Sequence, residues 1–560
     1  MTNRLKDLSE QKSLLPNTQH GARPGRSTES ALFNLVERIK LIKSYKLIPS
    51  LLALDVQKAF DNISHTRLLH CLREKRIPRQ ITSWVTSFLE DRSTSVKLGT
   101  FISENRKISL GIPQGSPISP ILYLFYNTKL LEELGETHLF ISPIGFVDDI
   151  TLLTYSDSIT TNCRRLEKAY KVCQNWARRY ASEFNSSKSE LIHFFRGKQS
   201  TKGLTLGNSL VEPKGSIRLL GVYLNRDLTP SVHLQKIQQK VPQLQKALGS
   251  ITKSTWGIQA PLARQLYLGA IRPALSYGAL AWYPLLEDRK QLTSTLANWQ
   301  GKFLRSILGA YRATATSALE IELNIEPLDL YIKRQATISL EQQAYKQKQE
   351  LNKLEISIKD RYSSLRRRTS KGTKKASIPN YIRVTKRLRS EGIQPIYCPK
   401  KQDMRWDKLK KTLATISGIQ WRKRWLKDNK GRDIARLRPF PTKRALHLYS
   451  NRAKAISSII LQLRSGKIGL NSFLYKRRVP GIDSENCLYC EEQVEESVKH
   501  FLLECNNWNE QRDRHLGRYK GYRDLRSILN SREGSLRAAK YLVATGRLEQ
   551  FQSVDLTNLK

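Results

Sequence analysis

The sequence has few acidic residues for its length, no long apolar run and only seven cysteines. Lys and Arg number 96 against 49 Asp and Glu, which leaves a formal net charge of +47. No run of about 18 apolar residues is present, so a membrane-spanning helix is not expected. The first residues, Met1–Leu5, lack the apolar stretch of a secretion signal. We therefore expect an intracellular protein whose cysteines are reduced, and paired ones suggest a metal site rather than a disulfide.

The surplus of positive charge restricts the class of partner. It must be neutralised by a polyanion or tolerated as self-repulsion. Nucleic acid is the favoured partner because phosphate contacts from Lys and Arg release counterions, and an anionic membrane surface is the competing one. With 560 residues and 39% hydrophobic content, the chain can hold three or four domains with buried cores.

Charge is concentrated in one part of the chain. Residues 351–450 contain 29 Lys and Arg against 7 Asp and Glu, so under a fifth of the chain carries nearly half of the net charge. Its first half resembles a linker in composition. In the second half, Trp406, Trp421 and Trp425 are interleaved with basic residues. These tryptophans either stack on bases or form the core of a small helical domain, and we favour the core.

Two adjacent carboxylates, Asp148 and Asp149, lie within an apolar segment. The flanking residues 144–147 and 150–153 read as short strands joined by a tight turn. Adjacent acids repel each other and resist burial, so either a divalent metal compensates them or they form a solvated hairpin tip.

A second acidic site follows the apolar run Leu51–Leu54. Asp55 comes directly after this run, as expected for an acid at the end of a buried central strand. Between the two sites, the glycines and prolines of residues 111–120 predict a tight turn, and a helix follows from Ile121. Asp61 is expected to cap the helical segment near Ser64.

The order of these segments resembles the palm of reverse transcriptases. Residues 184–191 and 217–224 are similar to the family's next motif and to its primer-grip hairpin, and residues 19–32 to the fingers segment of non-LTR (LINE-type) retrotransposon enzymes. Val147 stands where alanine is frequent, and as a strand-favouring residue it is expected to be tolerated. With these segments in the same order, the hairpin is interpreted as a metal site.

The resemblance implies an RNA-directed DNA polymerase that adds dNTPs to the 3′-hydroxyl of a DNA primer on an RNA template. Two Mg²⁺ ions would stabilise the attacking and leaving oxygens of the displacement. The implied residues are the Mg²⁺ ligands Asp55, Asp148 and Asp149 with the Val56 carbonyl, the sugar-stacking Phe60, the nucleotide- and template-lining Gln114 and Gly115, the triphosphate-contacting segment with Arg23, and Lys188 as proton donor to pyrophosphate.

The implied fold is α+β: a right-hand polymerase followed by a mainly helical basic tail. The chain opens just before the fingers segment, so relative to the family it is expected to be truncated, without upstream fingers motifs or an endonuclease. The expected regions are partial fingers and palm at 1–230, helical thumb or connection at 231–348 with a bend or break at Pro242, basic linker at 349–400, basic Trp-containing helices at 401–480, zinc knuckle at 481–520 and amphipathic tail at 521–560.

Near the C-terminus, four residues have zinc-ligand spacing. Cys487, Cys490, His500 and Cys505 follow the pattern C-x2-C-x9-H-x4-C, which predicts a closed tetrahedral Zn²⁺ site. Cys71, Cys163, Cys173 and Cys398 have no such spacing and are expected to be ordinary buried thiols. Together with residues 462–471, the knuckle resembles the tail of fungal Tad-like elements. A ribonuclease H domain is not expected, because its carboxylate pattern is missing.

Two alternatives remain open at this point. One is a retroelement remnant that binds nucleic acid without polymerising, which the expected truncation favours and the three intact aspartates oppose. The other is an intron-maturase-like splicing cofactor, against which the zinc-ligand set counts. The expected setting is the nucleus or cytoplasm, as a ribonucleoprotein with RNA template and target DNA, and no membrane partner is expected.

Overall fold

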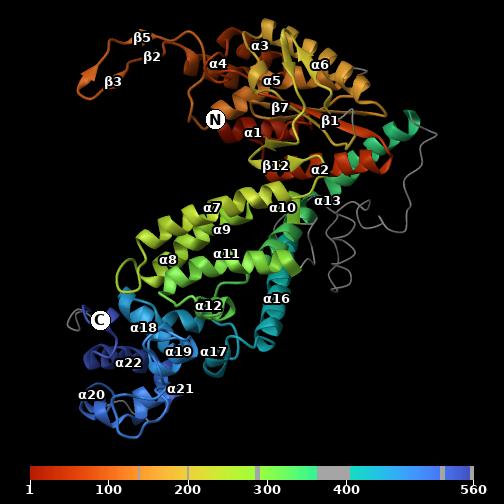
Figure 1. Cartoon of the computed structure of the whole chain (residues 1–560). Helices are drawn as coiled ribbons and strands as arrows, with labels where there is room; N and C mark the ends of the chain where they lie inside the picture. The colour runs from red at the N-terminus through yellow and green to blue at the C-terminus, as the bar shows by residue number, and fades with distance from the viewer. Residues whose placement is uncertain (137–138, 198–200, 284–289, 362–403, 518–523, 555–560) are drawn as a thin grey trace. The chain divides into compact units, whose positions relative to one another are not determined.

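The computed structural model describes residues 1–560 except 137–138, 198–200, 284–289, 362–403, 518–523 and 555–560 (Figure 1). The chain divides into two compact units. Unit 1 comprises residues 1–233, 278–285 and 339–401, and unit 2 comprises residues 234–277, 286–338 and 402–560. Each unit therefore collects segments that are distant in sequence, and the two are described separately below.

Unit 1 is built on a four-stranded antiparallel sheet with the order β6-β7-β1-β8. The strands are β1 (Ile48–Leu54), β6 (Ser142–Phe146), β7 (Asp149–Ser156) and β8 (Glu190–His193). Strand β1 is central, since it pairs with β7 on one side and β8 on the other. The predicted central strand before Asp55 and the predicted hairpin around Asp148 are both present.

Helices cover both faces of this sheet. Successive side chains along a strand point to opposite faces, and both sets are apolar here. Leu52 and Leu152, opposite each other in the register, pack in a cluster with α5 (Ser119–Glu136) and α6 (Ile159–Arg179). Leu51 and Leu153, one step along, pack in a second cluster with α2 (Thr28–Ser44). The result is three layers, and the strands read as continuous apolar runs because both faces are buried.

The remaining elements of unit 1 surround this core. Its other described helices include α1 (Thr2–Gln11), α3 (His65–Glu74), α4 (Arg79–Leu89), α10 (Ala279–Trp282) and the part of α13 (Leu328–Arg361) from residue 339. Two further hairpins pair β9 (Leu204–Leu206) with β10 (Ser209–Val211) and β11 (Ser216–Leu219) with β12 (Val222–Asn225), the second at the predicted primer-grip position.

A narrow ribbon extends away from the rest of unit 1 (Figure 1). It consists of β2 (Ser93–Thr94) paired with β5 (Arg106–Lys107), and β3 (Lys97–Leu98) paired with β4 (Phe101–Ile102). Its apolar side chains face solvent: Leu98 is 79% exposed and Phe101 65%.

Unit 2 is helical in its described part. Its elements are most of α7 (Ser231–Ser250), then α8 (Ala260–Leu266), α9 (Arg272–Ser276), α11 (Lys290–Leu308), α12 (Thr316–Glu322), the start of α13 (Leu328–Arg361), α16 (Met404–Leu426), α17 (Arg432–Leu437), α18 (Lys454–Ser465), α19 (Asn471–Lys476), α20 (Asn509–His515), α21 (Leu525–Asn530) and α22 (Arg532–Thr545). Pro242 does not break α7, which continues past it to Ser250.

A buried ion pair joins three helices of unit 2. Arg464 of α18 contacts Glu322 of α12 through two hydrogen bonds of 3.0 and 2.8 Å, and both side chains are fully buried. Tyr449 donates to the same carboxylate at 2.5 Å, and Arg464 also donates to the Leu529 carbonyl and the Asn530 side chain of α21. Burial favours a raised pKa for Glu322, but Arg464 outweighs it and the pKa is lowered.

The structure bears on two predictions about the basic region, the linker from residue 349 and the role of the tryptophans. Residues 349–361 are helical rather than linker, because Leu351 and Ile358 pack into the second core cluster of unit 1. Trp421 and Trp425 are buried, 8% and 3% exposed, which supports the core interpretation for these two. The Trp406 side chain, Cys398 and the expected linker at 362–400 lie outside the described residues. None of the helices in the described ranges is both long and apolar enough to cross a bilayer.

Candidate active site and candidate metal centre

The strand register brings the three predicted aspartates to one edge of the sheet. Leu54 is opposite Ile150 in the β1–β7 pair, so the next step of the same register sets Asp55 opposite Asp149. Asp148 occupies the β6–β7 loop beside them, because Phe146 and Asp149 already pair across the hairpin. Residues separated by more than ninety positions in sequence therefore lie together at the same end of two paired strands.

The hairpin loop differs from expectation at Val147. Val147 is not extended as a strand residue: its φ is +59°. This left-handed region is sterically unfavourable for a β-branched side chain. The expectation that valine is tolerated as a strand residue is therefore wrong about its conformation. Its carbonyl oxygen accepts a hydrogen bond from the Asn127 side-chain amide at 2.6 Å.

The aspartates are electrostatically frustrated without a cation. Desolvation raises the pKa of Asp149 to about 6, with further contributions from the charges of Asp148 and Asp55. The pKa of Asp148 is also raised, mainly by desolvation and then by Asp55. Carboxylates that lose hydration beside each other are stabilised by a cation, so this donor set fits Mg²⁺, which prefers oxygen ligands.

A cleft of about 820 Å³ opens at this edge of the sheet. Its lining includes Asp55, Asp148 and five of the other predicted site residues, namely Val56, Phe60, Gln114, Gly115 and Lys188. Asp149 lies outside the lining. The Lys188 ammonium is 3.3 Å from the Asp55 carboxylate, so a cation already occupies one side of the carboxylate group.

The predicted turn at residues 111–120 is fixed against the segment that follows β1. The Gly111 amide donates to the Ile63 carbonyl at 2.8 Å, and a Cβ at Gly111, where φ is +78°, would lie 2.6 Å from the Asp61 carbonyl oxygen. Gln114 donates to the Asp61 side chain at 3.0 Å. Asp61 is therefore not the helix cap that the sequence suggested, since Ser64 caps α3.

Three further contacts orient residues that line the cleft. The Phe60 ring stacks on Tyr123 of α5 with centroids 5.4 Å apart. The Asp55 carbonyl accepts from the Asn185 amide at 3.0 Å, and Val56 forms a bridge with Phe184. The segment that carries Lys188 is thus joined by backbone hydrogen bonds to the residues around Asp55.

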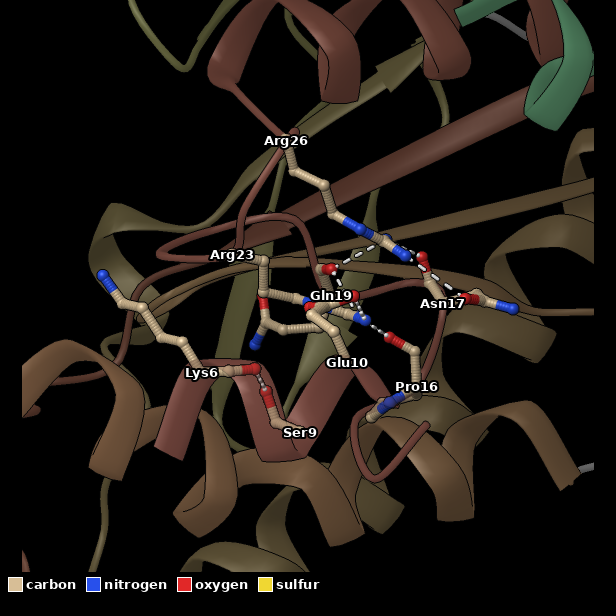
Figure 2. Close-up of polar contacts among 8 residues, drawn as sticks. All are labelled: Lys6, Ser9, Glu10, Pro16, Asn17, Gln19, Arg23 and Arg26. Atoms are coloured by element: carbon tan, nitrogen blue, oxygen red, sulfur yellow. Dashed lines mark hydrogen bonds and ion pairs between the residues drawn. The ribbon is translucent and has the colours of Figure 1, made fainter. Parts of the chain in front are cut away.

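Arg23 is not brought to this cleft. Its guanidinium forms a double hydrogen bond with the Glu10 carboxylate, at 2.6 and 3.0 Å, and donates to the carbonyls of Pro16 and Gln19 (Figure 2). The Arg23 side chain is only 3% exposed. A triphosphate contact would have to replace these bonds, so the structure favours a structural role for Arg23 over the predicted one.

The four predicted zinc ligands converge in unit 2. The ligand atoms of Cys487, Cys490, His500 and Cys505 all lie within 4.8 Å of one another, and no other group of three or more such residues gathers this closely in the described ranges. Cys487 lies in the loop before the helical turn His500–Glu504, and Cys505 caps the end of that turn. The spacing prediction is confirmed as a cluster of potential ligands.

The distances within the cluster match tetrahedral coordination. Zn–S and Zn–N bonds of about 2.3 and 2.05 Å at tetrahedral angles place sulfurs about 3.8 Å apart, and sulfur and nitrogen about 3.6 Å apart. The Cys487 and Cys505 sulfurs are 3.8 Å apart, and the Cys490 sulfur is 3.5 Å from the His500 Nε2. Desolvation raises the pKa of the Cys487 thiol to about 12, and a bound cation would reverse this by favouring the thiolate.

Residues 1–224 match the sequence model of a family described as "Reverse transcriptase (RNA-dependent DNA polymerase)". The RNA-directed DNA polymerase from mobile element jockey of Drosophila melanogaster is 29% identical over 336 residues, which are 58% of this chain and 36% of that protein. The retrovirus-related Pol polyprotein from type-1 retrotransposable element R1 2 of Nasonia vitripennis is 21% identical, over 71% of this chain and 85% of its own.

Among solved structures, apo telomerase from Candida tropicalis aligns with 74% of this chain and 57% of its own at 12% identity. Its TM-score of 0.31 is too low to establish a shared fold. The sequence match instead coincides with the three-layered unit and its cleft. This chain spans little more than a third of the jockey polymerase, so the activity of that whole relative is not carried over with the match.

Proposed function

Because residues 1–224 match the family model described as reverse transcriptase (RNA-dependent DNA polymerase), we propose that this chain is an RNA-directed DNA polymerase of a non-LTR retrotransposon. It adds dNTPs to a DNA primer 3′-hydroxyl on an RNA template. The observation that carries the proposal is the convergence of Asp55, Asp148 and Asp149 at the ends of neighbouring strands, where Asp55 and Asp148 line one cleft with Phe60, Gln114 and Lys188.

The aspartates are the proposed ligands of two Mg²⁺ ions, with the Val56 carbonyl as a further ligand. When bound, the metals supply charge stabilisation to the attacking and leaving oxygens of the phosphoryl transfer. The raised pKa values of Asp148 and Asp149, caused mainly by desolvation, support this role because a bound cation would stabilise the charged carboxylates.

Lys188 changes partner in this scheme. In the structure it pairs with Asp55 at 3.3 Å. Lys188 would lose this partner if a cation were bound at Asp55, and its ammonium would then be available to donate a proton to the departing pyrophosphate. Phe60, on its Tyr123 support, packs against the nucleotide sugar and disfavours a 2′-hydroxyl, while Gln114 and Gly115 line the nucleotide and the template.

We further propose the right-hand arrangement for this chain: the sheet of unit 1 as palm, α1 and α2 as partial fingers, and helices of unit 2 as thumb. A cavity of about 1130 Å³ within unit 2 supports a nucleic-acid role for that unit, because its lining is polar. Four basic residues and no acidic ones take part in that lining, namely Lys253, Lys302, Arg305 and Arg312. Such a surface suits phosphates.

For the C-terminal cluster we propose a structural Zn²⁺ ion, within a tail of the fungal Tad-like kind. The ligand separations support this metal. Metal quantitation on the purified full chain should give one zinc per chain, and Cys487→Ser should lower it. Cys173→Ser, which alters a buried cysteine of unit 1, is the control and should leave the zinc content unchanged. Zinc-free folded protein would refute this part.

The polymerase proposal is tested by primer extension on an RNA template with and without Mg²⁺. The wild-type chain should extend the primer only with the metal, and Asp148→Asn should reduce extension by at least about 10²-fold. Asp157→Asn, at an exposed position outside the cleft, should not. If folded wild-type protein binds the template but never extends the primer, the alternative of a binding-only remnant replaces the enzyme.

The cellular setting remains part of the proposal. We propose that the chain works inside the cell as a ribonucleoprotein, in the cytoplasm or nucleus. Its net charge of +47 supports tight association with RNA. Fractionation of expressing cells with and without ribonuclease should release the chain from large particles only after RNA digestion.

A further inference from the structure

The loop that carries Asp148 needs an external support. Val147 and Asp148 form the two-residue loop between paired Phe146 and Asp149. Val147 has a positive φ, and Asp148 is not among the described residues that do. A positive φ at the first loop position alone is the pattern of a type II′ turn, in which glycine normally occupies that position. Valine holds such a conformation only where its surroundings enforce it.

Asn127 provides part of that enforcement. It lies on α5 and is 1% exposed, and its side-chain amide donates to the Val147 carbonyl oxygen at 2.6 Å. This carbonyl belongs to the peptide that joins Val147 to Asp148. A fixed orientation of that peptide fixes the starting direction of the Asp148 side chain.

Gln19 in turn holds Asn127. Gln19 is fully buried, and its amide donates to the Asn127 side-chain oxygen at 3.1 Å. The backbone on either side of Gln19 pairs with β6: the His20 amide donates to the Gly145 carbonyl at 2.8 Å, and the Gly145 amide donates to the Thr18 carbonyl at 2.9 Å. Residues 18–20 thus run beside β6 and form a single parallel bridge with it, between Gln19 and Gly145.

Close approach completes this contact. A Cβ at Gly21 would lie 2.5 Å from the Val147 side chain, and a Cβ at Gly145 would lie 2.9 Å from the Gln19 side-chain oxygen. Both positions therefore require glycine for the segment to reach the hairpin. The backbone of residues 19–21 packs directly on the strained loop.

An outer set of cations fixes the segment from the other side. Arg23 and Arg26 both donate to the Gln19 carbonyl, at 3.3 and 2.9 Å, and Glu10 of α1 holds Arg23 (Figure 2). Arg26 donates in addition to the Asn17 carbonyl at 2.5 Å. The contacts form one continuous path from α1 through Gln19 and Asn127 to the hairpin.

We propose that Asn127 is a positioning residue for the metal-binding aspartates, and that Gln19 holds Asn127 in place. The Asn127–Val147 contact keeps the loop in its left-handed conformation and so aims Asp148 into the cleft. This inference rests on the proposed polymerase function for its meaning, but not for its test, since metal binding can be measured without catalysis.

The test uses the full chain and three variants. Asn127→Leu removes the donor while keeping a side chain that branches at the γ atom. Val147→Gly in that background removes the need for the donor, because glycine adopts a positive φ without strain. Thr128→Val is the matched control: Thr128 is equally buried on α5, and its hydroxyl bonds only the Leu124 carbonyl, at 2.6 Å. Mn²⁺ binding is followed by electron paramagnetic resonance, and the Mg²⁺ midpoint and KM for primer–template by extension.

Asn127→Leu should raise the Mn²⁺ and Mg²⁺ midpoints about tenfold and leave KM for primer–template unchanged. The double variant should return both midpoints to within about threefold of wild type, and Thr128→Val should not move them. Should Asn127→Leu fail to fold, Asn127→Asp keeps the acceptor for Gln19, loses the donor when ionised, and should shift the midpoints in the same direction.

Four results would overturn the inference: unshifted midpoints in Asn127→Leu, an equal shift in Thr128→Val, no recovery in the double variant, or no Mn²⁺ binding by the wild type. If the wild type binds Mn²⁺ without extending primers, the proposed function fails alone. The Mn²⁺ midpoints of the variants then still decide the role of Asn127.

Discussion

Removal of the Arg464 guanidinium should weaken unit 2 more than any exposed charge change. In Arg464→Met, the fully buried Glu322 loses two charge-assisted bonds and keeps only the Tyr449 donor. Breaking a buried pair in this way costs about 3–5 kcal/mol. The Leu529 carbonyl loses a donor as well. The expected loss of local stability is therefore at least about 3 kcal/mol.

Amide hydrogen exchange in α18 reports this loss directly. Since about 1.4 kcal/mol is a factor of ten, protection should fall roughly 10²- to 10³-fold. Arg537→Met is the matched control, because Arg537 pairs with Glu533 one helical turn away and both side chains are solvent-accessible; it should cost under about 0.5 kcal/mol. A fall of less than tenfold in Arg464→Met, or one equal to that of the control, would refute the reasoning.

A double variant distinguishes the loss of the ion-pair attraction from the cost of leaving Glu322 buried and unpaired. Glu322→Leu combined with Arg464→Met leaves no buried unpaired charge, so it should be more stable than Arg464→Met alone. The pH dependence has a defined sign as well. Arg464 lowers the pKa of Glu322 despite its burial, so the pair's stabilisation is present above the ordinary glutamate pKa and is lost as pH falls through the lower folded value.

Three further outcomes concern unit 1. The pKa of Asp149 is raised to about 6, so protons compete with metal below that value. The Mg²⁺ midpoint of primer extension should therefore rise as pH falls from about 7 to 5. A constant midpoint would contradict the assignment of Asp149 as a ligand. Phe60→Val should raise incorporation of ribonucleotides relative to dNTPs about tenfold or more in single-nucleotide extension, and an unchanged ratio would remove Phe60 from sugar selection. Gly111→Ala should lower the free energy of unfolding in urea by more than about 2 kcal/mol, because its Cβ would meet the Asp61 carbonyl. Gly115→Ala has open space around it and a φ of +89°, so it should lower that free energy by about 1 kcal/mol. Equal losses would contradict this interpretation of the turn.

The sheet and its acidic edge were predictable from local sequence. The apolar runs before Asp55 and after Asp149 are strands because both of their faces are covered by helices. The cysteine spacing likewise predicted which four side chains meet. In each case a short segment carries the pattern of residue types, whereas the approach of Asp55 to the Asp148–Asp149 hairpin was implied by the family resemblance.

Other features could not be predicted, because they depend on contacts between distant segments. Arg23 follows a motif that suggests phosphate contact, yet Glu10 and two carbonyls surround its guanidinium. The left-handed conformation of Val147 is enforced by Asn127 and Gly21, and valine gives no local signal for it. Residues 349–361 fall in the predicted basic linker, but Ile358 is fully buried in the core of unit 1.

Because of the exposed ribbon of unit 1, added salt should have opposite effects on two properties of this basic chain: self-association increases and binding to nucleic acid weakens. Leu98 and Phe101 present uncovered apolar surface on short strands, a surface prone to self-association. At low ionic strength the net charge of +47 keeps chains apart, and added salt screens that repulsion. The same salt weakens contacts with phosphates. Nucleic-acid-free protein at high salt should therefore associate, so that light scattering per unit mass rises with protein concentration. Exchange of Leu98 and Phe101 for Thr should suppress that rise.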